Sequence, residues 1–118
     1  MAELTVYEKP TCTTCKRLHE LLTERGVDFD TVEHHVEGIS EERLRELLAK
    51  GGLRPGDVLR TREPLVAELG LDRDPPPPDD EVITLMVEHP VLIQRPLVER
   101  GDRVVLARPV ERVLELLD

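Results

Sequence analysis

Aromatic residues are almost absent from this sequence. Its 118 residues include no tryptophan, one tyrosine (Tyr7) and one phenylalanine (Phe29). Leucine and valine therefore have to supply nearly all of the apolar surface that folding buries. No apolar run approaches the ~20 residues that a transmembrane helix requires, and the first residues, MAELTVYE, lack the basic and apolar regions of a signal peptide. These absences predict a cytoplasmic protein.

Positive charge is also scarce. The 16 lysines and arginines are outnumbered by 25 aspartates and glutamates, which gives a formal net charge of −9. Because affinity for nucleic acid depends on clustered cations, this balance argues against direct nucleic-acid binding. The length is that of one ordinary domain, and 39% hydrophobic with 35% charged residues is typical of a globular protein. We expect a single domain over residues 1–118 that does not contact a membrane.

The apolar pattern of the N-terminal part predicts a βαβ unit. Residues 3–8 (ELTVYE) alternate as in a short strand, which Lys9-Pro10-Thr11 interrupts. Apolar residues then recur at helical spacing from Thr13 to Gly26, where the helix is expected to end. A second strand is predicted within residues 27–36 (VDFDTVEHHV). Two strands joined through a helix pair in parallel with a right-handed crossover.

The rest of the chain predicts a helical insert, a hairpin and a last helix. The insert, roughly residues 38–90, contains several helical stretches and a stiff proline-rich connector, DRDPPPPDD. Residues 97–99 and 104–107 then flank a turn as the strands of a hairpin, and Pro109 is expected at the first position of the last helix. The order β-α-β, insert, β-β-α predicts an α/β fold. The helices of the insert are expected over 40–51, 55–59, 63–71 and up to 89, the last one capped by Asp79 or Asp80.

Both cysteines of the chain lie in one CxxC motif, between the first predicted strand and helix. A CxxC at this point of a βαβ unit is typical of a thioredoxin-like redox site. Cys12 precedes the first helical turn, where free N–H groups and the helix dipole stabilise a thiolate, and Lys16 and Arg17 add positive charge. Cys15 shares the apolar helix face of Leu18 and is expected to be more buried. The motif predicts Cys12 as the nucleophile and Cys15 as the resolving thiol.

Two other uses of the motif stay open at this point. A structural zinc site needs four ligands, so histidines would have to complete it, and none has zinc-finger spacing. The cysteines would also serve as small buried apolar residues. Redox chemistry is favoured over both, and no metal is expected. The histidines are His19, His34, His35 and His89; the consecutive pair is predicted to lie at the surface.

Four segments together are similar to a known family. They are YEKPTCTTCK at the front, VLRTREPLVAELGL in the insert, HPVLIQRPLV before the hairpin and ARPVERVLELL at the end. In this combination the chain resembles the arsenate reductase family of the thioredoxin-like fold, which also contains the transcriptional regulator Spx. The resemblance implies a small four-stranded mixed sheet with the helical insert packed beside it. It also implies a cis-proline opposite the CxxC at the start of the third strand, and Pro96 holds that position.

The resemblance further implies an oxyanion site. In the glutaredoxin-linked arsenate reductases three arginines surround the nucleophilic cysteine, and by motif these are Arg60, Arg95 and Arg108 here. Arg62 is an alternative to Arg60. Guanidinium groups suit a tetrahedral oxyanion because each presents paired N–H donors and a positive charge. No cofactor is implied beyond an external thiol donor, such as glutathione with glutaredoxin, or thioredoxin.

Cys15 departs from the pattern of those enzymes, which usually lack a cysteine there and use glutathione as the resolving thiol. The CxxC is more similar to that of Spx, a redox switch that contacts the RNA polymerase α-subunit. ARPVERVLELL, in contrast, resembles the reductases. We therefore expect a thiol-dependent reductase with an internal resolving thiol. The alternatives are a Spx-like redox switch and a generic disulfide oxidoreductase without arsenate activity.

Overall fold

The structure, a computed structural model, describes residues 3–9 and 12–117. Pro10 and Thr11, which are predicted to interrupt the first strand, lie outside the described residues, as do the two ends of the chain. Within the described ranges, no helix combines the length and the apolar character that crossing a membrane would require.

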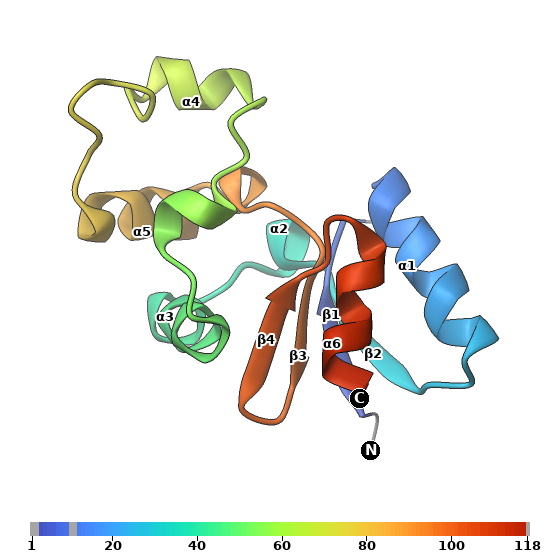
Figure 1. Cartoon of the computed structure of the whole chain (residues 1–118). Coiled ribbons are helices and arrows are strands. Elements are labelled where there is room, and N and C mark those ends of the chain that lie inside the picture. The colour runs from blue at the N-terminus through green and yellow to red at the C-terminus, as the bar shows by residue number, and fades with distance from the viewer. Residues whose placement is uncertain (1–2, 10–11, 118) are drawn as a thin grey trace.

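Four short strands form one mixed sheet (Figure 1). They are β1 (Leu4–Tyr7), β2 (Phe29–Val32), β3 (Leu97–Arg100) and β4 (Arg103–Leu106). β1 pairs in parallel with β2 and antiparallel with β3, and β3 pairs antiparallel with β4 across the hairpin. The order across the sheet is β2-β1-β3-β4. The predicted four-stranded mixed sheet is confirmed.

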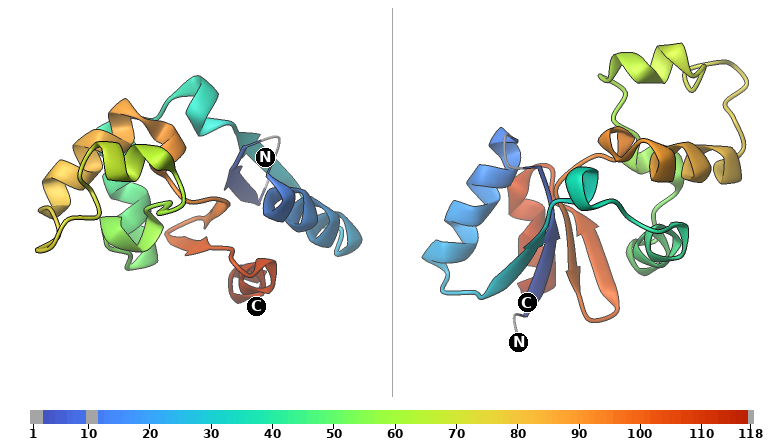
Figure 2. Two further views of the ribbon diagram at one scale, coloured as in Figure 1. Left: turned by 90° about the horizontal axis from the view of Figure 1, so that it is seen from above. Right: turned by 180° about the vertical axis from the view of Figure 1, so that it is seen from behind.

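The helices lie on two sides of the sheet (Figure 2). α1 (Thr13–Glu24) and the C-terminal α6 (Leu114–Leu117) are on one side, and α3 (Glu41–Gly51) is on the other with the rest of the insert. The remaining elements are α2 (His34–Glu37), α4 (Pro64–Glu68), α5 (Asp79–Glu88) and 3₁₀ turns over Pro55–Val58, Pro90–Leu92 and Val110–Val113.

Strand alternation explains why the sheet has a core on each face. Neighbouring side chains of a strand point to opposite faces, as Leu97 and Val98 do in β3. Val98 packs in a cluster with Leu18 and Leu22 of α1, whereas Leu97 packs in a second cluster with Leu44 of α3. The second cluster therefore joins the insert to the sheet.

The second strand is shorter than predicted. β2 ends at Val32, and the helical turn α2 begins at His34 inside the stretch expected to be a strand. The turn is closed by Glu37, whose Oε2 accepts the N–H of Glu33 at 2.7 Å. The His34 side chain is buried, so the prediction of a surface position is wrong for this residue. The side chain of His35 lies outside the described part of the structure.

Two helix starts also differ from their predictions. Pro109 is the N-cap of the last helical segment rather than its first residue, and this segment opens as a 3₁₀ turn before it becomes α6. Pro78 takes the N-cap position of α5, so Asp79 and Asp80 lie in its first turn. Their negative charges still favour the helix there, because they face the positive end of its dipole.

A buried carboxylate links the insert to the sheet. Glu99 of β3 is 9% exposed and contacts both Arg43 and Lys50 of α3, with Lys50 Nζ 2.5 Å from Oε2. Arg43 also donates to the Tyr7 hydroxyl at 2.7 Å, and Lys50 to the carbonyl of Gly101 at 2.9 Å. Burial raises the pKa of the Glu99 carboxyl, but the two cations outweigh burial and hold its pKa below the ordinary value.

Glu99→Gln is expected to lower the free energy of unfolding by about 2 kcal/mol at pH 7, because both cations lose a buried partner. The carboxylate contributes stability above its unfolded pKa of about 4.3. This contribution disappears as the pH falls through the lower pKa of the folded state. Urea unfolding at neutral and at successively lower pH measures both effects.

Glu46→Gln is the matched control, since exposed Glu46 contacts the same Arg43 and Lys50. An exposed pair contributes little, so we expect a change below about 0.5 kcal/mol. Equal losses in the two variants would contradict the prediction. So would a Glu99→Gln loss that does not shrink towards acid pH.

Candidate active site

Cys12 lies at the N-terminal end of α1 as its N-cap residue. Its backbone N–H donates to the carbonyl of Lys9 at 3.0 Å, and its carbonyl accepts the N–H of Lys16 at 3.1 Å. The Cys12 sulfur accepts the backbone N–H of Cys15 at 3.3 Å, in the place that a serine or aspartate oxygen usually takes at an N-cap. The sulfur therefore accepts an N–H group that has no partner within the helix, and it lies at the positive end of the helix dipole.

The two thiols differ in acidity. Burial opposes ionisation of Cys12, but hydrogen bonds from Cys15 and the hydrogen bond and charge of Arg95 leave the pKa of Cys12 below its ordinary value. Burial raises the pKa of Cys15 to about 12, and the nearby Cys12 sulfur and the Glu8 carboxylate contribute to this rise. Both residues are free thiols. Cys12 is thus the more acidic sulfur.

A cavity of about 210 Å³ opens at Cys12 and is lined by four arginines. Its walls come from the start of α1, from the segment after the Pro55–Val58 turn and from residues that flank the hairpin. No carboxylate is among the described residues that line it. Four arginines in a lining that also holds Cys12 give this cavity a positive charge. The lining residues are Cys12, Thr13, Thr14, Arg60, Arg62, Arg95 and Arg108.

Arg95 is the most enclosed of these arginines. Its side chain is buried, and its Nε has no hydrogen-bond partner among the described residues. A buried N–H of a cation without a partner is costly, so its position beside the sulfur indicates a place for an anionic group. The backbone carbonyl of Arg95 accepts Nη1 of Arg108 at 3.0 Å, which fixes Arg108 next to it.

Arg60 and Arg62 reach the cavity from the insert. Nη1 of Arg60 donates to Oε1 of Gln94 at 3.0 Å, and its Nε lies 3.2 Å from Oε1 of Glu63. These two contacts hold the half-buried Arg60 in one orientation. Arg62 is exposed and lines the same cavity. The motif leaves open which of the two arginines faces the site, and the structure brings both to it.

Sequence reasoning missed the residues that hold or accompany the arginines. Gln94 and Glu63 act by positioning Arg60, and no motif points to such a role. The available signal for Gln94 is that it is the chain's single glutamine and directly precedes Arg95. Thr13 and Thr14, between the two cysteines, line the cavity and were not predicted to do so.

Other residues singled out in the sequence lie beside the cavity lining rather than in it. Pro96 directly precedes β3, and its bond to Arg95 is cis, as are Asp74–Pro75 and Arg108–Pro109. The carbonyl of Pro96 accepts the N–H of Ala107 at 3.0 Å.

Among residues 3–9 and 12–117, no group of three His, Cys, Asp or Glu side chains is arranged to hold a metal ion.

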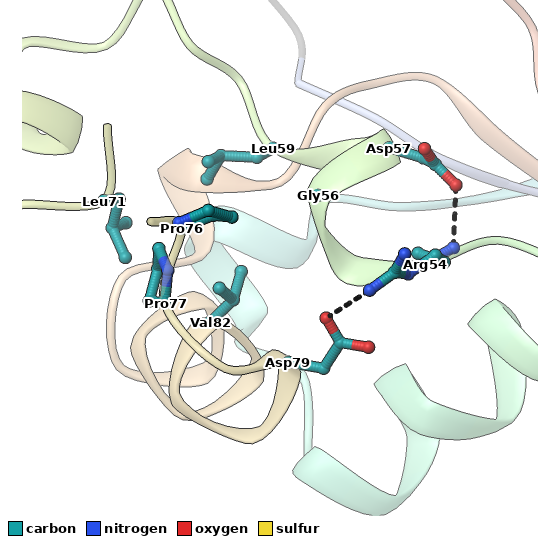
Figure 3. Close-up of a pocket in the computed structure, with 9 residues that line it drawn as sticks. All are labelled: Arg54, Gly56, Asp57, Leu59, Leu71, Pro76, Pro77, Asp79 and Val82. Atoms are coloured by element: carbon teal, nitrogen blue, oxygen red, sulfur yellow. Dashed lines mark hydrogen bonds and ion pairs between the residues drawn. The ribbon is translucent and has the colours of Figure 1, made fainter. Parts of the chain in front are cut away.

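A second cavity, of about 250 Å³, lies inside the insert (Figure 3). Its walls are largely apolar and include Leu59, Leu71 and Val82. At its rim, Arg54 is paired through its side chain with Asp79, and its backbone N–H donates to a carboxylate oxygen of Asp57 at 2.8 Å (Figure 3). Its lining includes no cysteine and no unpaired buried polar group among the described residues. This cavity therefore offers no thiol for the redox chemistry predicted from the CxxC motif.

Known proteins are similar to this chain over nearly its whole length. The model of the ArsC family matches residues 7–116. An arsenate reductase from Rhizobium meliloti is 34% identical over 114 residues, which are 97% of this chain and 81% of that protein. The arsenate reductase of Escherichia coli K12 is 35% identical over 118 residues, 99% of this chain and 82% of that protein.

A solved structure agrees with the sequence relatives. The arsenate reductase from Vibrio cholerae superposes with a TM-score of 0.90 at 30% sequence identity, and the match covers 97% of each chain. The predicted thioredoxin-like fold and the predicted family are both confirmed by these matches. The chain belongs to the ArsC family.

Proposed function

We propose that this protein is a thiol-dependent reductase of arsenate or of a closely related oxyanion. Thiol-dependent enzyme chemistry follows from the family, whose members named above are arsenate reductases. The observation that carries the proposal is the meeting of Cys12 with Arg60, Arg95 and Arg108 in one cavity. A tetrahedral oxyanion suits this cavity because its oxygens accept paired N–H donors from the planar guanidinium groups. Arg62 adds a fourth, more exposed cation.

In the proposed first step, the anionic sulfur of Cys12 attacks arsenic. A sulfur–arsenic bond forms, one arsenic–oxygen bond breaks, and the protonated oxygen leaves as water. The charge of the substrate would repel the thiolate, so neutralisation by the arginines is required as well as orientation. The unpaired Nε of Arg95 provides a donor for the bound oxyanion.

In the proposed second step, Cys15 attacks the Cys12 sulfur. A Cys12–Cys15 disulfide forms, the sulfur–arsenic bond breaks, and its electron pair stays on arsenic, which leaves as arsenite. Two thiols lose the two electrons that arsenic gains. The 3.3 Å contact between the Cys15 N–H and the Cys12 sulfur supports this role, because the two cysteines are already adjacent. An external thiol donor, thioredoxin or glutathione with glutaredoxin, then reduces the disulfide.

A coupled assay tests the substrate. Arsenate-dependent oxidation of NADPH is measured with thioredoxin and its reductase and, separately, with glutathione, glutaredoxin and glutathione reductase. We expect turnover that depends on arsenate in at least one of the two systems. If thiol titration shows reactive Cys12 but neither system responds to arsenate, the protein does not reduce arsenate.

Cys15→Ser separates internal from external resolution. We expect thioredoxin-supported turnover to fall by about 30-fold, because the internal disulfide that thioredoxin reduces is no longer formed. Turnover with glutathione and glutaredoxin should change by less than about 3-fold, since glutathione can attack the Cys12 adduct directly. The same coupled assay measures both rates. Equal effects in the two systems would show that Cys15 is not the resolving thiol.

The cavity favours the reductase over the two alternatives. A redox switch that binds the RNA polymerase α-subunit needs only thiols that pair, and the relatives reported above are named as reductases. A generic disulfide oxidoreductase likewise makes no use of four arginines around its sulfur. Insulin reduction that is unaffected by Arg95→Ala, together with no response to arsenate, would favour the generic oxidoreductase.

A further inference from the structure

Glu8 is a buried carboxylate that the reaction proposed above does not use. It is 5% exposed and directly follows β1, where its backbone N–H donates to the carbonyl of Val32 at 2.9 Å. Nε2 of His19 lies 2.6 Å from Oε2 of Glu8. Among the described residues, its ion-pair partner is therefore a histidine and not an arginine or a lysine. A carboxylate is costly to bury, so this position calls for an explanation.

Glu8 and the Cys15 thiol are linked through α1 and through the backbone at Lys9. The backbone of Lys9, the next residue along the chain, hydrogen-bonds with the Cys15 sulfur. His19 follows Cys15 by four residues on α1, so the two side chains are neighbours on the helix surface. Burial is the main cause of the raised pKa of Cys15, and the negative charge of Glu8 adds to it. The buried carboxylate thus contacts a residue that neighbours Cys15 on α1, and its charge acts on the buried thiol.

We propose that Glu8 accepts the proton of the Cys15 thiol when Cys15 attacks the Cys12 adduct, and that His19 positions the carboxylate. The inference rests on the proposed role of Cys15 as the resolving thiol. In this step the Cys15 S–H bond breaks and its proton moves to an oxygen of Glu8. The Cys15 sulfur forms the disulfide with Cys12, and the group bound to Cys12 leaves with the electron pair. The His19 side chain, which contacts Glu8, is 37% exposed.

The pKa values of the Glu8 carboxyl and the Cys15 thiol move closer together during the reaction. Burial raises the pKa of Glu8 above its ordinary value in spite of the opposing effect of His19, which makes the carboxylate a better base near neutral pH. Burial is the largest cause of the raised pKa of Cys15. The Cys12 sulfur raises this pKa further, through a hydrogen bond and through its charge. This second contribution disappears once Cys12 is bound in an adduct. Cys15 becomes more acidic at the stage at which it has to act.

The charged groups around Glu8 come from both neighbouring segments. His19 contacts it from α1, and the charge of Glu8 acts on Cys15 of the same helix. Glu33, between β2 and α2, adds a negative charge that contributes to the raised pKa of Glu8. The pH dependence of the resolving step should therefore follow the ionisation of Glu8 within this group.

The test uses dithiobis(nitrobenzoate), an aromatic disulfide that yields a coloured thiolate. Attack by Cys12 releases the first thiolate and leaves a mixed disulfide on Cys12. Attack by Cys15 then releases the second thiolate and forms the Cys12–Cys15 disulfide. Stopped-flow absorbance resolves the two releases without arsenate or a protein donor. The resolving step can thus be measured separately from the proposed substrate.

Glu8→Gln is expected to slow the second release by about 20-fold at neutral pH and to change the first by less than about 2-fold. A loss of about 20-fold is at the low end for removal of a proton acceptor, because water can partly take over the role of the carboxylate. In the wild type the rate of the second release should rise with pH as Glu8 loses its proton. In the variant it should follow the Cys15 thiol alone and rise only at more alkaline pH. Glu8→Asp should restore part of the rate.

The variant is expected to remain folded. Because the pKa of Glu8 is raised in the folded state, its ionisation lowers stability as the pH rises through that value. A neutral glutamine removes this cost at pH 7, and circular dichroism checks the fold. Glu20→Gln, an exposed carboxylate on α1, is the matched control and should leave both releases unchanged.

The outcomes distinguish this inference from the proposed function. Cys15→Ser should abolish the second release. If the wild type itself shows no second release, Cys15 is not a resolving thiol, and both the resolving role and the inference fail. If the second release is present but has the same rate and pH profile in Glu8→Gln, only the role of Glu8 is overturned.

Discussion

Cys12→Ser is expected to lower arsenate reduction by more than about 10³-fold, to the rate of the assay without enzyme. A serine hydroxyl stays protonated at neutral pH and does not take part in thiol–disulfide exchange, so neither proposed step can occur. The fold should survive, because serine is a favoured N-cap residue and can accept the Cys15 N–H in place of sulfur. The coupled assay and urea unfolding on the same preparation measure the two properties.

Alkylation of the wild-type protein examines the same sulfur without a substrate. The rate of reaction with iodoacetamide, measured against pH, should have its midpoint below the ordinary cysteine value of about 8.5. The direction follows from the hydrogen bonds of Cys15 and from Arg95, which outweigh burial and lower the pKa of Cys12. Cys15 is more deeply buried and should react more slowly. A midpoint at 8.5 or above, or arsenate reduction by Cys12→Ser, would contradict the assignment.

Much of the fold is predictable from apolar periodicity. α1, α3, α5 and the hairpin lie within a few residues of their predicted ranges. Each of them buries a continuous apolar face, as Leu18 and Leu22 do in α1 and Val98 does in β3. In these elements the apolar pattern of the sequence agrees with the face that is buried in the fold. Elements with this agreement can be predicted from sequence.

The end of β2 shows where this reasoning fails. In a strand, His34 and Val36 would lie on the same face. In α2 they do not: His34 is 1% exposed, whereas Val36 is 71% exposed. Burying the histidine and exposing the valine reverses the usual preference, so hydrophobic periodicity predicts the wrong element. Which of these two side chains is buried depends on the residues that pack against α2. A single sequence does not show which residues these are.

The candidate site is predictable only in part. Cys12 follows from the CxxC and its position before a helix, but the arginines follow from resemblance. Apolar periodicity does not distinguish Arg95 from Arg103, which donates to a backbone carbonyl near the C-terminus. The contact of Glu8 with His19 joins a strand end to a helix face. Such pairs depend on how elements pack, so periodicity and motif spacing do not reveal them.

Arg95→Lys is expected to lower kcat/KM for arsenate by about 100-fold. Lysine keeps the positive charge but loses the planar fork that can donate to two oxyanion oxygens. The hydrogen bond and charge of Arg95 also help to lower the pKa of Cys12, so the alkylation midpoint should move upward, further in Arg95→Met than in Arg95→Lys. Arg25→Lys is the control, because exposed Arg25 lies at the opposite end of α1 and should change neither quantity.

The stability of Arg95→Met separates a loss of oxyanion binding from a folding defect. Arg108 donates to the backbone carbonyl of Arg95, which the substitution keeps. Nε of Arg95 has no hydrogen-bond partner among the described residues. Removing a buried cation of this kind should leave the free energy of unfolding unchanged or raise it by up to about 1 kcal/mol. Urea unfolding measures this while the coupled assay shows activity lost. If stability falls together with activity, Arg95 is a structural residue, because an oxyanion ligand has no reason to stabilise the empty site.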